Sequence, residues 1–583
     1  MPWIQIYDPA GYPLLSILAA ALPLVVLLVL LGIFEISAQW AALCGLGVAL
    51  LVSVLVYGMP PVNAAAAAGY GVAFGLLPIG WIVLSAVFLY NLTVATGQFE
   101  IIKHSIATLS ADRRVQALLI GYSFGAFIEG AAGFGTPVAI CAALLMGLGF
   151  PPLHAAGLCL IANTAPVAFG AIGTPILTLA GVTQQDAFVL GQMAGRQLPF
   201  VSVLITAWIV VTMSGWKGLR GVWPVVMVCG GSFAVVQYLW SNFVGPELVD
   251  VTGGLASLGA TALFVSRWKP RDHWDFPASA APGDTLEPPS GSALKSSYPR
   301  ARVARAWMPW VFLSVLVFFW GLPSTKALLN GGIDGWSAFH NTGKPGPDKP
   351  LLSPRFEIPS LHRLVFRDYP VAPVRIDGRR VEEPAYQSVH AESAVYTLNW
   401  LSATGTGILL AALLTALFLG LRPGQVVCVA ARTVRQMRWP LVTIACMLAL
   451  GYVTRYSGTD ATLGLAFTRT GRVYPFFAAL LGWLGVALTG SDTSSNILFG
   501  SLQKITAQQL GLNPVLITTA NSTGGVMGKM IDAQSIVVST AATRQSGQEG
   551  AILRYVFWHS VALATIMGAI VLLQAYVFPW MVP

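Results

Sequence analysis

The sequence predicts an all-α polytopic membrane protein with about 12 to 14 membrane segments, built as two inverted-topology repeats that each contain a re-entrant hairpin and a broken helix. Of its 583 residues, 55% are hydrophobic and only 10% are charged, and the mean hydropathy is +0.69. A soluble domain of this length would not show such a composition. Polar, glycine-broken motifs also occur twice within the apolar sequence, which is typical of a transporter site between repeats.

Apolar runs long enough to cross a bilayer recur from end to end. The clearest are 14–34, 38–57, 71–95, 201–215, 222–243, 255–265, 307–322, 398–419, 439–452 and 556–578. The six cysteines show no pairing pattern and the seven histidines show no metal-ligand spacing. We therefore expect no disulfide framework, no metal site and no cofactor.

Lysine and arginine collect in short connections, which the positive-inside rule places in the cytoplasm. Their distribution predicts the following division: an N-terminal membrane half at 1–267 with its repeat core at 115–185, a cytoplasmic linker at 268–306, a span at 307–322, an extracytoplasmic insert at 323–395, and a C-terminal membrane half at 396–583 with its repeat core at 473–543. Net charge of +9 does not indicate nucleic acid in such a chain. The bilayer is the expected partner.

The insert has little excess charge of either sign. Within it, Asp377-Gly378 stands between short β-prone runs and predicts a hairpin. A lid or docking element is one interpretation, but we favour a solvated decoration.

The two repeat cores have matching motifs. Hairpin turns are predicted at Ala131–Pro137 and Ser491–Asn496, and helix breaks at Asn163–Pro166 and Asn521–Gly525. The first core begins in the cytoplasm and ends outside, and the second runs the opposite way, which is inverted-repeat architecture. Backbone freed at membrane depth must be buried in protein or line a wet cavity, so the breaks are expected to meet at one central site. The alternative is that small residues merely allow close helix packing.

Ionisable residues inside the cores are few, and each is a functional candidate because burying its charge in a membrane is costly. Glu129 is the only Asp, Glu, Lys or Arg in 115–185, while Asp492, Lys529 and Asp532 occupy the second core. Glu129, Asp492 and Asp532 are candidates for proton coupling. Lys529 could neutralise Asp532 three residues later or attract an anionic substrate, and the sequence leaves both open.

Two further cations, Lys504 and Arg455, lie near the ends of predicted spans. We expect both to reach water at the membrane interface.

Four stretches make the sequence recognisable: Phe127–Val138, Asn163–Gly170 with Gly173-Thr-Pro175, Thr489–Asn496 and Gly525–Ser535. They closely resemble the bacterial L-lactate permease family, and the resemblance extends over almost the whole chain. It implies a bacterial inner-membrane importer of 2-hydroxymonocarboxylates coupled to protons, with L-lactate foremost and D-lactate and glycolate as further substrates. Preference among these three is not set by the sequence, nor are the proton stoichiometry and the oligomeric state.

Other functions were weighed against this one. The Ala-Asn-Thr and Ala-Asn-Ser tripeptides are distantly similar to the Ser-Asn-Thr motifs of sodium-coupled carboxylate transporters, which are the main alternative. A passive anion channel could use the same half-helix dipoles. An enzyme is not expected, because no nucleophile, metal cluster or carboxylate pair is grouped at the water interface.

The predicted site combines backbone N–H groups at the breaks, which suit a carboxylate, with short polar side chains. The candidate substrate-binding residues are Gly133, Gly135, Thr136, Asn163, Thr164, Ser494, Ser495, Asn521, Ser522, Thr523 and Lys529. A proton on Glu129, Asp492 or Asp532 would offset the charge of the substrate.

Overall fold

The computed structural model describes residues 3–583 except 33, 35, 108, 132, 134–135, 273, 277–297, 322, 331–351, 372–374, 377–378, 381–390, 544 and 546–547. Within the described residues, nine helices are long and apolar enough to cross a membrane. The chain is therefore an all-α polytopic membrane protein, as the sequence predicts. Shorter apolar helices also occur, at 137–147, 152–162, 171–183 and 404–419, and they belong largely to the first repeat core.

The first half is a run of helices: α1 (Pro13–Gly32), α2 (Ala38–Leu55), α3 (Pro61–Phe74), the π-helical η1 (Gly75–Gly80), α4 (Trp81–Ala95), α5 (Gln98–Ala107), α6 (Arg113–Gln116), the π-helical η2 (Ala117–Phe124), α7 (Gly125–Ala131), α8 (Thr136–Gly147), α9 (Pro152–Ala162), the 3-10 turn η3 (Ala171–Gly173), α10 (Thr174–Thr183), α11 (Ala187–Phe243) and α12 (Val249–Arg267). The 57-residue α11 contains two of the predicted spans. It bends at Gly215, whose φ of +68° suits glycine alone.

The second half contains α13 (Arg300–Gly321), α14 (Pro323–Leu329), α16 (Thr404–Leu419), α17 (Pro423–Ser457), α18 (Thr459–Phe467), η4 (Thr468–Val473), α19 (Tyr474–Thr489), α20 (Asp492–Gln509), α21 (Pro514–Gly528), η5 (Lys529–Ile531), α22 (Ala533–Ala542), α23 (Glu549–Tyr576) and η6 (Pro579–Met581). The predicted break at Asn521–Gly525 is wrong, because α21 continues through it and the helix breaks at 529–532. The glycines of this motif serve packing instead. A Cβ on Gly524 would lie 2.5 Å from the Cα of Ala479, so α21 can approach α19 closely only without one.

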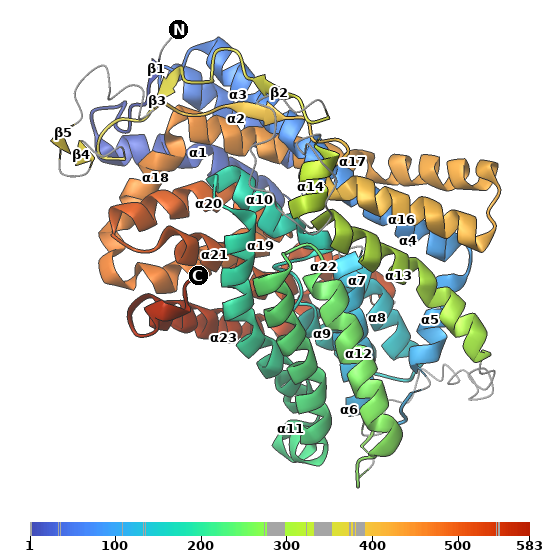
Figure 1. The fold of residues 1–583 in the computed structure, drawn as a ribbon. Coiled ribbons are helices and arrows are strands. Elements are labelled where there is room, and N and C mark those ends of the chain that lie inside the picture. The colour runs from blue at the N-terminus through green and yellow to red at the C-terminus, as the bar shows by residue number, and fades with distance from the viewer. Residues whose placement is uncertain are drawn as a thin grey trace.

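Short strands gather beside α2 and α3 at one end of the helix bundle, which we call the strand end (Figure 1). β1 (Trp3–Ile4) pairs in parallel with β3 (Val365–Phe366), and β2 (Arg355–Glu357) pairs antiparallel with β6 (Val395–Thr397). β4 (Arg375–Ile376) pairs antiparallel with β5 (Arg379–Arg380), on either side of the predicted Asp377-Gly378 turn, which itself lies outside the described residues. The N-terminal segment and the insert thus form one layer.

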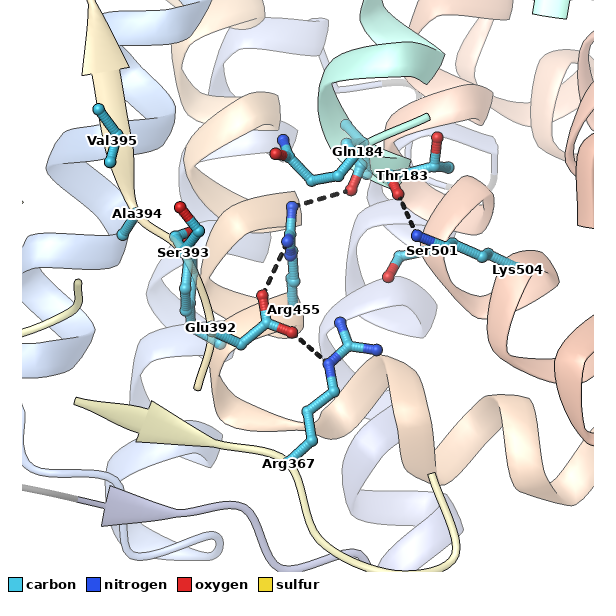
Figure 2. A network of polar contacts seen from close by, with 12 residues as sticks. Thr183, Gln184, Arg367, Glu392, Ser393, Ala394, Val395, Arg455, Ser501 and Lys504 are labelled. Carbon is cyan, nitrogen blue, oxygen red and sulfur yellow. Dashed lines mark hydrogen bonds and ion pairs between the residues drawn. The ribbon is translucent and has the colours of Figure 1, made fainter. Parts of the chain in front are cut away.

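The described part of the insert is docked onto the helices, which contradicts the expectation of a solvated decoration. The carboxylate of Glu392 accepts hydrogen bonds from Arg367 of the insert and from Arg455 of α17, the latter at 2.8 Å (Figure 2). Tyr70 and Tyr456, from α3 and α17, donate hydroxyl hydrogen bonds to backbone carbonyls of Val395 and Ser393. Insert and membrane helices are therefore joined by buried polar contacts.

The interfacial placement expected for Arg455 is also wrong, since its side chain is only 7% exposed. Besides Glu392, it donates to the carbonyl oxygen of Val182 at 3.3 Å, and Lys504 donates to that of Thr183 at 2.7 Å. These two cations cap the C-terminal end of α10, where carbonyl groups have no partner within the helix (Figure 2).

A second cluster of ion pairs around a buried arginine, which we call the arginine centre, lies just before the first repeat core. Arg114 is fully buried and pairs with Asp112 at 2.8 Å and with Asp272, just beyond α12, at 3.1 Å. Its guanidinium also donates to the Gly218 carbonyl of α11. The ion pair with Arg114 lowers the pKa of the Asp272 carboxyl. This centre fixes the start of η2 against α11 and the segment after α12.

Candidate functional site

The first repeat core contains a long break between α9 and α10. Asn163 ends α9, and the chain resumes a regular helix only at Thr174. Gly170 and Gly173 have positive φ angles of 50° and 73°, so the chain turns sharply twice within the break. The Thr164 hydroxyl bonds back to the Ile161 carbonyl. A buried break of this kind occurs at the predicted place.

Asn163 is buried, and within the described part of the chain neither atom of its amide group makes a hydrogen bond. It lies beside the carboxyl of Glu129 but without hydrogen-bond geometry. Buried amides are almost always paired, so an unpaired one indicates a place for a ligand or water.

The second core forms a closed network at the start of α20. Ser522 donates to Oδ2 of Asp492 at 2.5 Å and Asn496 donates to the same oxygen at 3.3 Å. Asn521 donates to Asn496 at 2.9 Å and accepts from Gln503 at 2.8 Å. Asn521, unlike Asn163, is therefore satisfied by protein partners, although the two residues occupy matching sequence motifs.

Lys529 connects the two cores. Its Nζ atom donates to the Gly490 carbonyl at 2.6 Å and lies 3.3 Å from Oδ2 of Asp532, so the predicted i, i+3 pair forms. Lys529 also interacts electrostatically with Glu129 of the first core and with Asp492 of the second. We call Glu129, Asn163, Asp492, Lys529 and Asp532 the junction cluster. All five are buried.

Packing of the helices explains how the cluster forms. The break at η5 and the following α22 pack on α8 and α9, which brings the second core's Lys529 and Asp532 to the first core's Glu129. Asn496 also crosses between cores, donating to the Pro175 carbonyl at the start of α10 at 3.2 Å. The structure therefore brings ionisable residues of both cores together.

The remaining candidates have varied positions. Gly133 lies in the turn between α7 and α8 with φ of 59°, Gly135 is outside the described residues, and Thr136 begins α8. Ser494 is half-buried in the first turn of α20, and Ser495 donates to the Gly482 carbonyl. The Thr523 hydroxyl donates to Gln197 of α11 at 2.6 Å, which ties α21 to α11 rather than facing the junction cluster.

Sequence reasoning missed Asp250, a buried carboxyl at the start of α12 that interacts electrostatically with Glu129. Its acidic side chain just before an apolar run was the available signal. A depression of about 400 Å³ at the strand end, lined in part by Tyr7, Asp368 and Arg469, shares no residue with the junction cluster.

A polytopic helical protein with ionisable side chains buried beside breaks in its helices has the construction of a membrane transporter. The L-lactate permease family model matches residues 16–578, and the chain belongs to that family.

Curated relatives match along their whole length. The glycolate permease GlcA of Escherichia coli K12 is 46% identical over 582 residues, which cover 99% of each chain. The L-lactate permeases of Bacillus subtilis 168 and Escherichia coli K12 are 45% and 44% identical, each covering 100% of both chains.

Proposed function

We propose that this protein imports L-lactate, and also D-lactate and glycolate, across the bacterial inner membrane by proton symport. Family membership and relatives named as L-lactate and glycolate permeases support this substrate class. The observation that carries the proposal is the junction cluster, where the unpaired amide of Asn163 lies beside an acid, Glu129, that interacts with the cation Lys529. Such a place suits a small anion and a proton.

In the proposed complex, the substrate carboxylate accepts hydrogen bonds from Asn163 and from backbone N–H groups of the break that follows it. Lys529 supplies positive charge, and Gly133, Gly135 and Thr136 contribute to the site from the first core. Thr164, Ser494, Ser495, Asn521, Ser522 and Thr523 complete or support the second side.

The proton is carried by Glu129, Asp492 or Asp532. One lactate and one proton then cross together with no net charge. An uncompensated charge moving through 100 mV would gain or lose about 2.3 kcal/mol.

Transport proceeds in this proposal by alternating access between two inverted repeats. The order of elements supports it: α7, α8, α9 and α10 in the first core correspond to α19, α20, α21 and α22 in the second. In the second core a tight turn separates the first two helices, and in each core a break separates the last two. The two breaks meet at the junction cluster, so relative motion of the cores would open it to either side.

The test is internal pH in sodium-free proteoliposomes after an inward L-lactate gradient is imposed, with protein-free vesicles correcting for leak of lactic acid. Protein-dependent acidification with L-lactate but not with succinate supports the proposal. Uptake that appears only with sodium would refute proton symport and identify a sodium-coupled carboxylate carrier. Lactate flux without proton movement would indicate a passive anion channel.

A further inference from the structure

Asp250 is placed against the helix that carries Glu129. A Cβ at Gly130 would lie 2.8 Å from the Cβ of Asp250 and 2.6 Å from the backbone nitrogen of Val251, so α12 and α7 touch at the residue next to Glu129. Asp250 interacts electrostatically with Glu129, and the backbone N–H of Gly170 in the α9–α10 break lies near it. The junction cluster thus has a neighbouring acid on a helix outside both repeat cores.

The carboxyl of Asp250 is buried with the Gly170 backbone N–H nearby and without an ion-pair partner among the described residues. The residue is 1% exposed, and within the described part of the chain neither of its oxygens makes a hydrogen bond or an ion pair. Burying an ionised carboxylate without a partner costs several kcal/mol, whereas the protonated acid carries no charge. Glu129 has an unpaired buried oxygen as well.

Among the residues that the structure describes, no lysine or arginine interacts with Asp250. Glu129 on α7 and the Tyr122 hydroxyl on η2 are the titratable groups that interact with it. Helix α11 packs on α12, and its C-terminal stretch, residues 221–243, contains no Asp, Glu, Lys or Arg. A proton is therefore the counter-charge that this position lacks.

Asp250 also lies close in the chain to a partly exposed ion pair. Glu247, three residues earlier, pairs with Lys326 of α14 at 3.3 Å, and the Lys326 side chain is 40% exposed. Glu247 lies just before α12, and Asp250 is in the first turn of that helix. Asp250 therefore follows the Glu247–Lys326 pair in the chain and packs against the residue next to Glu129.

We propose that Asp250 is a proton-binding residue that exchanges its proton with Glu129 and links the junction cluster to the Glu247 end of α12. The idea rests on the proposed proton symport. In the step, the protonated Asp250 gives its proton to the Glu129 carboxylate and becomes a carboxylate itself. A hydronium ion from the Glu247 side then restores the proton to Asp250, leaving water, so atoms and charge balance.

Two transport assays in proteoliposomes separate this role from a structural one. The first measures accumulation of L-lactate driven by a pH gradient, and the second measures exchange of labelled for unlabelled L-lactate at equal pH. Exchange does not require Glu129 to lose its proton. Asp250→Asn is therefore expected to lower accumulation by about tenfold or more while exchange stays within about twofold of the wild type.

Asp250→Glu, which keeps an acid, is expected to recover accumulation. Asp186→Asn is the matched control, because Asp186 is an exposed N-cap of α11 and asparagine caps helices equally well.

Infrared spectroscopy gives a readout independent of transport. The solubilised wild type should show a protonated carboxylic acid band whose intensity falls in Asp250→Asn by the contribution of one carboxyl group. If the band is unchanged in that variant, the proposal is overturned. It is also overturned if Asp250→Asn accumulates lactate like the wild type, or if Asp250→Asn and Asp250→Glu lose exchange equally. A wild type that has the band but shows no pH-driven accumulation would refute proton symport alone.

Discussion

Glu392 is expected to hold the insert on the helices, and Glu392→Gln is expected to release it. The glutamate lies between Arg367 and Arg455, and the Arg455 side chain is 7% exposed. Removing the carboxylate leaves that guanidinium buried without its counter-charge, retaining a 3.3 Å hydrogen bond to the Val182 carbonyl. Breaking one partner of a buried ion pair costs about 3–5 kcal/mol, which is about two to three and a half powers of ten in an equilibrium constant.

The docked fraction can be measured through a buried reporter. Ala394 is fully buried beside Glu392 when the insert is docked. In a background where the exposed Cys44 and Cys428 are replaced by serine, Ala394→Cys should react slowly with a thiol reagent. Adding Glu392→Gln should raise the labelling rate by about 10²-fold or more.

Glu357→Gln is the matched control on the same insert. Its side chain is 75% exposed and lies 3.7 Å from His362, and an exposed pair of this kind contributes at most about 1 kcal/mol. The control should leave the labelling rate within about fivefold of the wild type. Equal labelling rates for Glu392→Gln and Glu357→Gln would refute the claim that the ion pairs hold the insert.

Three further predictions concern pH, packing and the site. Burial alone would raise the pKa of Glu392, but the charges of Arg455 and Arg367 outweigh burial and lower the pKa to about 2. The contribution of Glu392 to docking of the insert should therefore be constant above about pH 5 and be lost as the pH falls from about 4.5 toward 2. Labelling of the Ala394→Cys reporter should rise over this acidic range in the presence of Glu392, and this pH dependence should disappear in Glu392→Gln. Gly482→Ala should lower the melting temperature, because the new Cβ would lie 1.9 Å from the Asn521 carbonyl oxygen. Gly231→Ala is the control and should not lower it, because the space around its Cβ is open. Equal melting temperatures of the two variants would contradict this packing argument. Asn163→Ala should raise KM for L-lactate with little change in melting temperature, because the Asn163 amide has no protein partner to lose. Asn521→Ala should lower the melting temperature, because it breaks hydrogen bonds to Asn496 and Gln503. Identical effects of the two variants would show that the two asparagines are equivalent.

The grouping of Glu129 with Lys529 and Asp532 could be predicted from sequence because charges are so few in the apolar cores that each was already a functional candidate. The sequence could not predict that the amide of Asn163 is unpaired and that of Asn521 is hydrogen-bonded. The matching tripeptides contain no information about which side chains from other helices contact them. Asp250 was missed for a related reason. Asp250 precedes the apolar run 255–265, so from the sequence it is expected in a loop outside the membrane. Only the packing of Gly130 on α12 places it beside Glu129.

The docked insert was missed because its key contact joins residues 63 positions apart. Solvated and docked inserts have similar composition, since a single acid between two arginines changes the charge count very little. What distinguishes them is tertiary geometry: Glu392 reaches the end of α17, and Tyr70 and Tyr456 present hydroxyl groups to the backbone beside it. Local sequence patterns do not determine which residues distant in the chain come into contact.

Charge balance among the buried acids supports the proposed proton coupling. Lys529 is the only lysine or arginine among the junction cluster and Asp250, which together contain four carboxyl groups. Four carboxylates and one ammonium would leave three negative charges buried, at a cost no membrane protein of ordinary stability could bear. Asp532 differs from the other three because it pairs with Lys529 and accepts a hydrogen bond from the Ser535 backbone N–H at 2.7 Å. In the proposed proton symport, protons held by the other three carboxyl groups would supply the missing balance, and proton and monocarboxylate binding would be parts of one electrostatic balance.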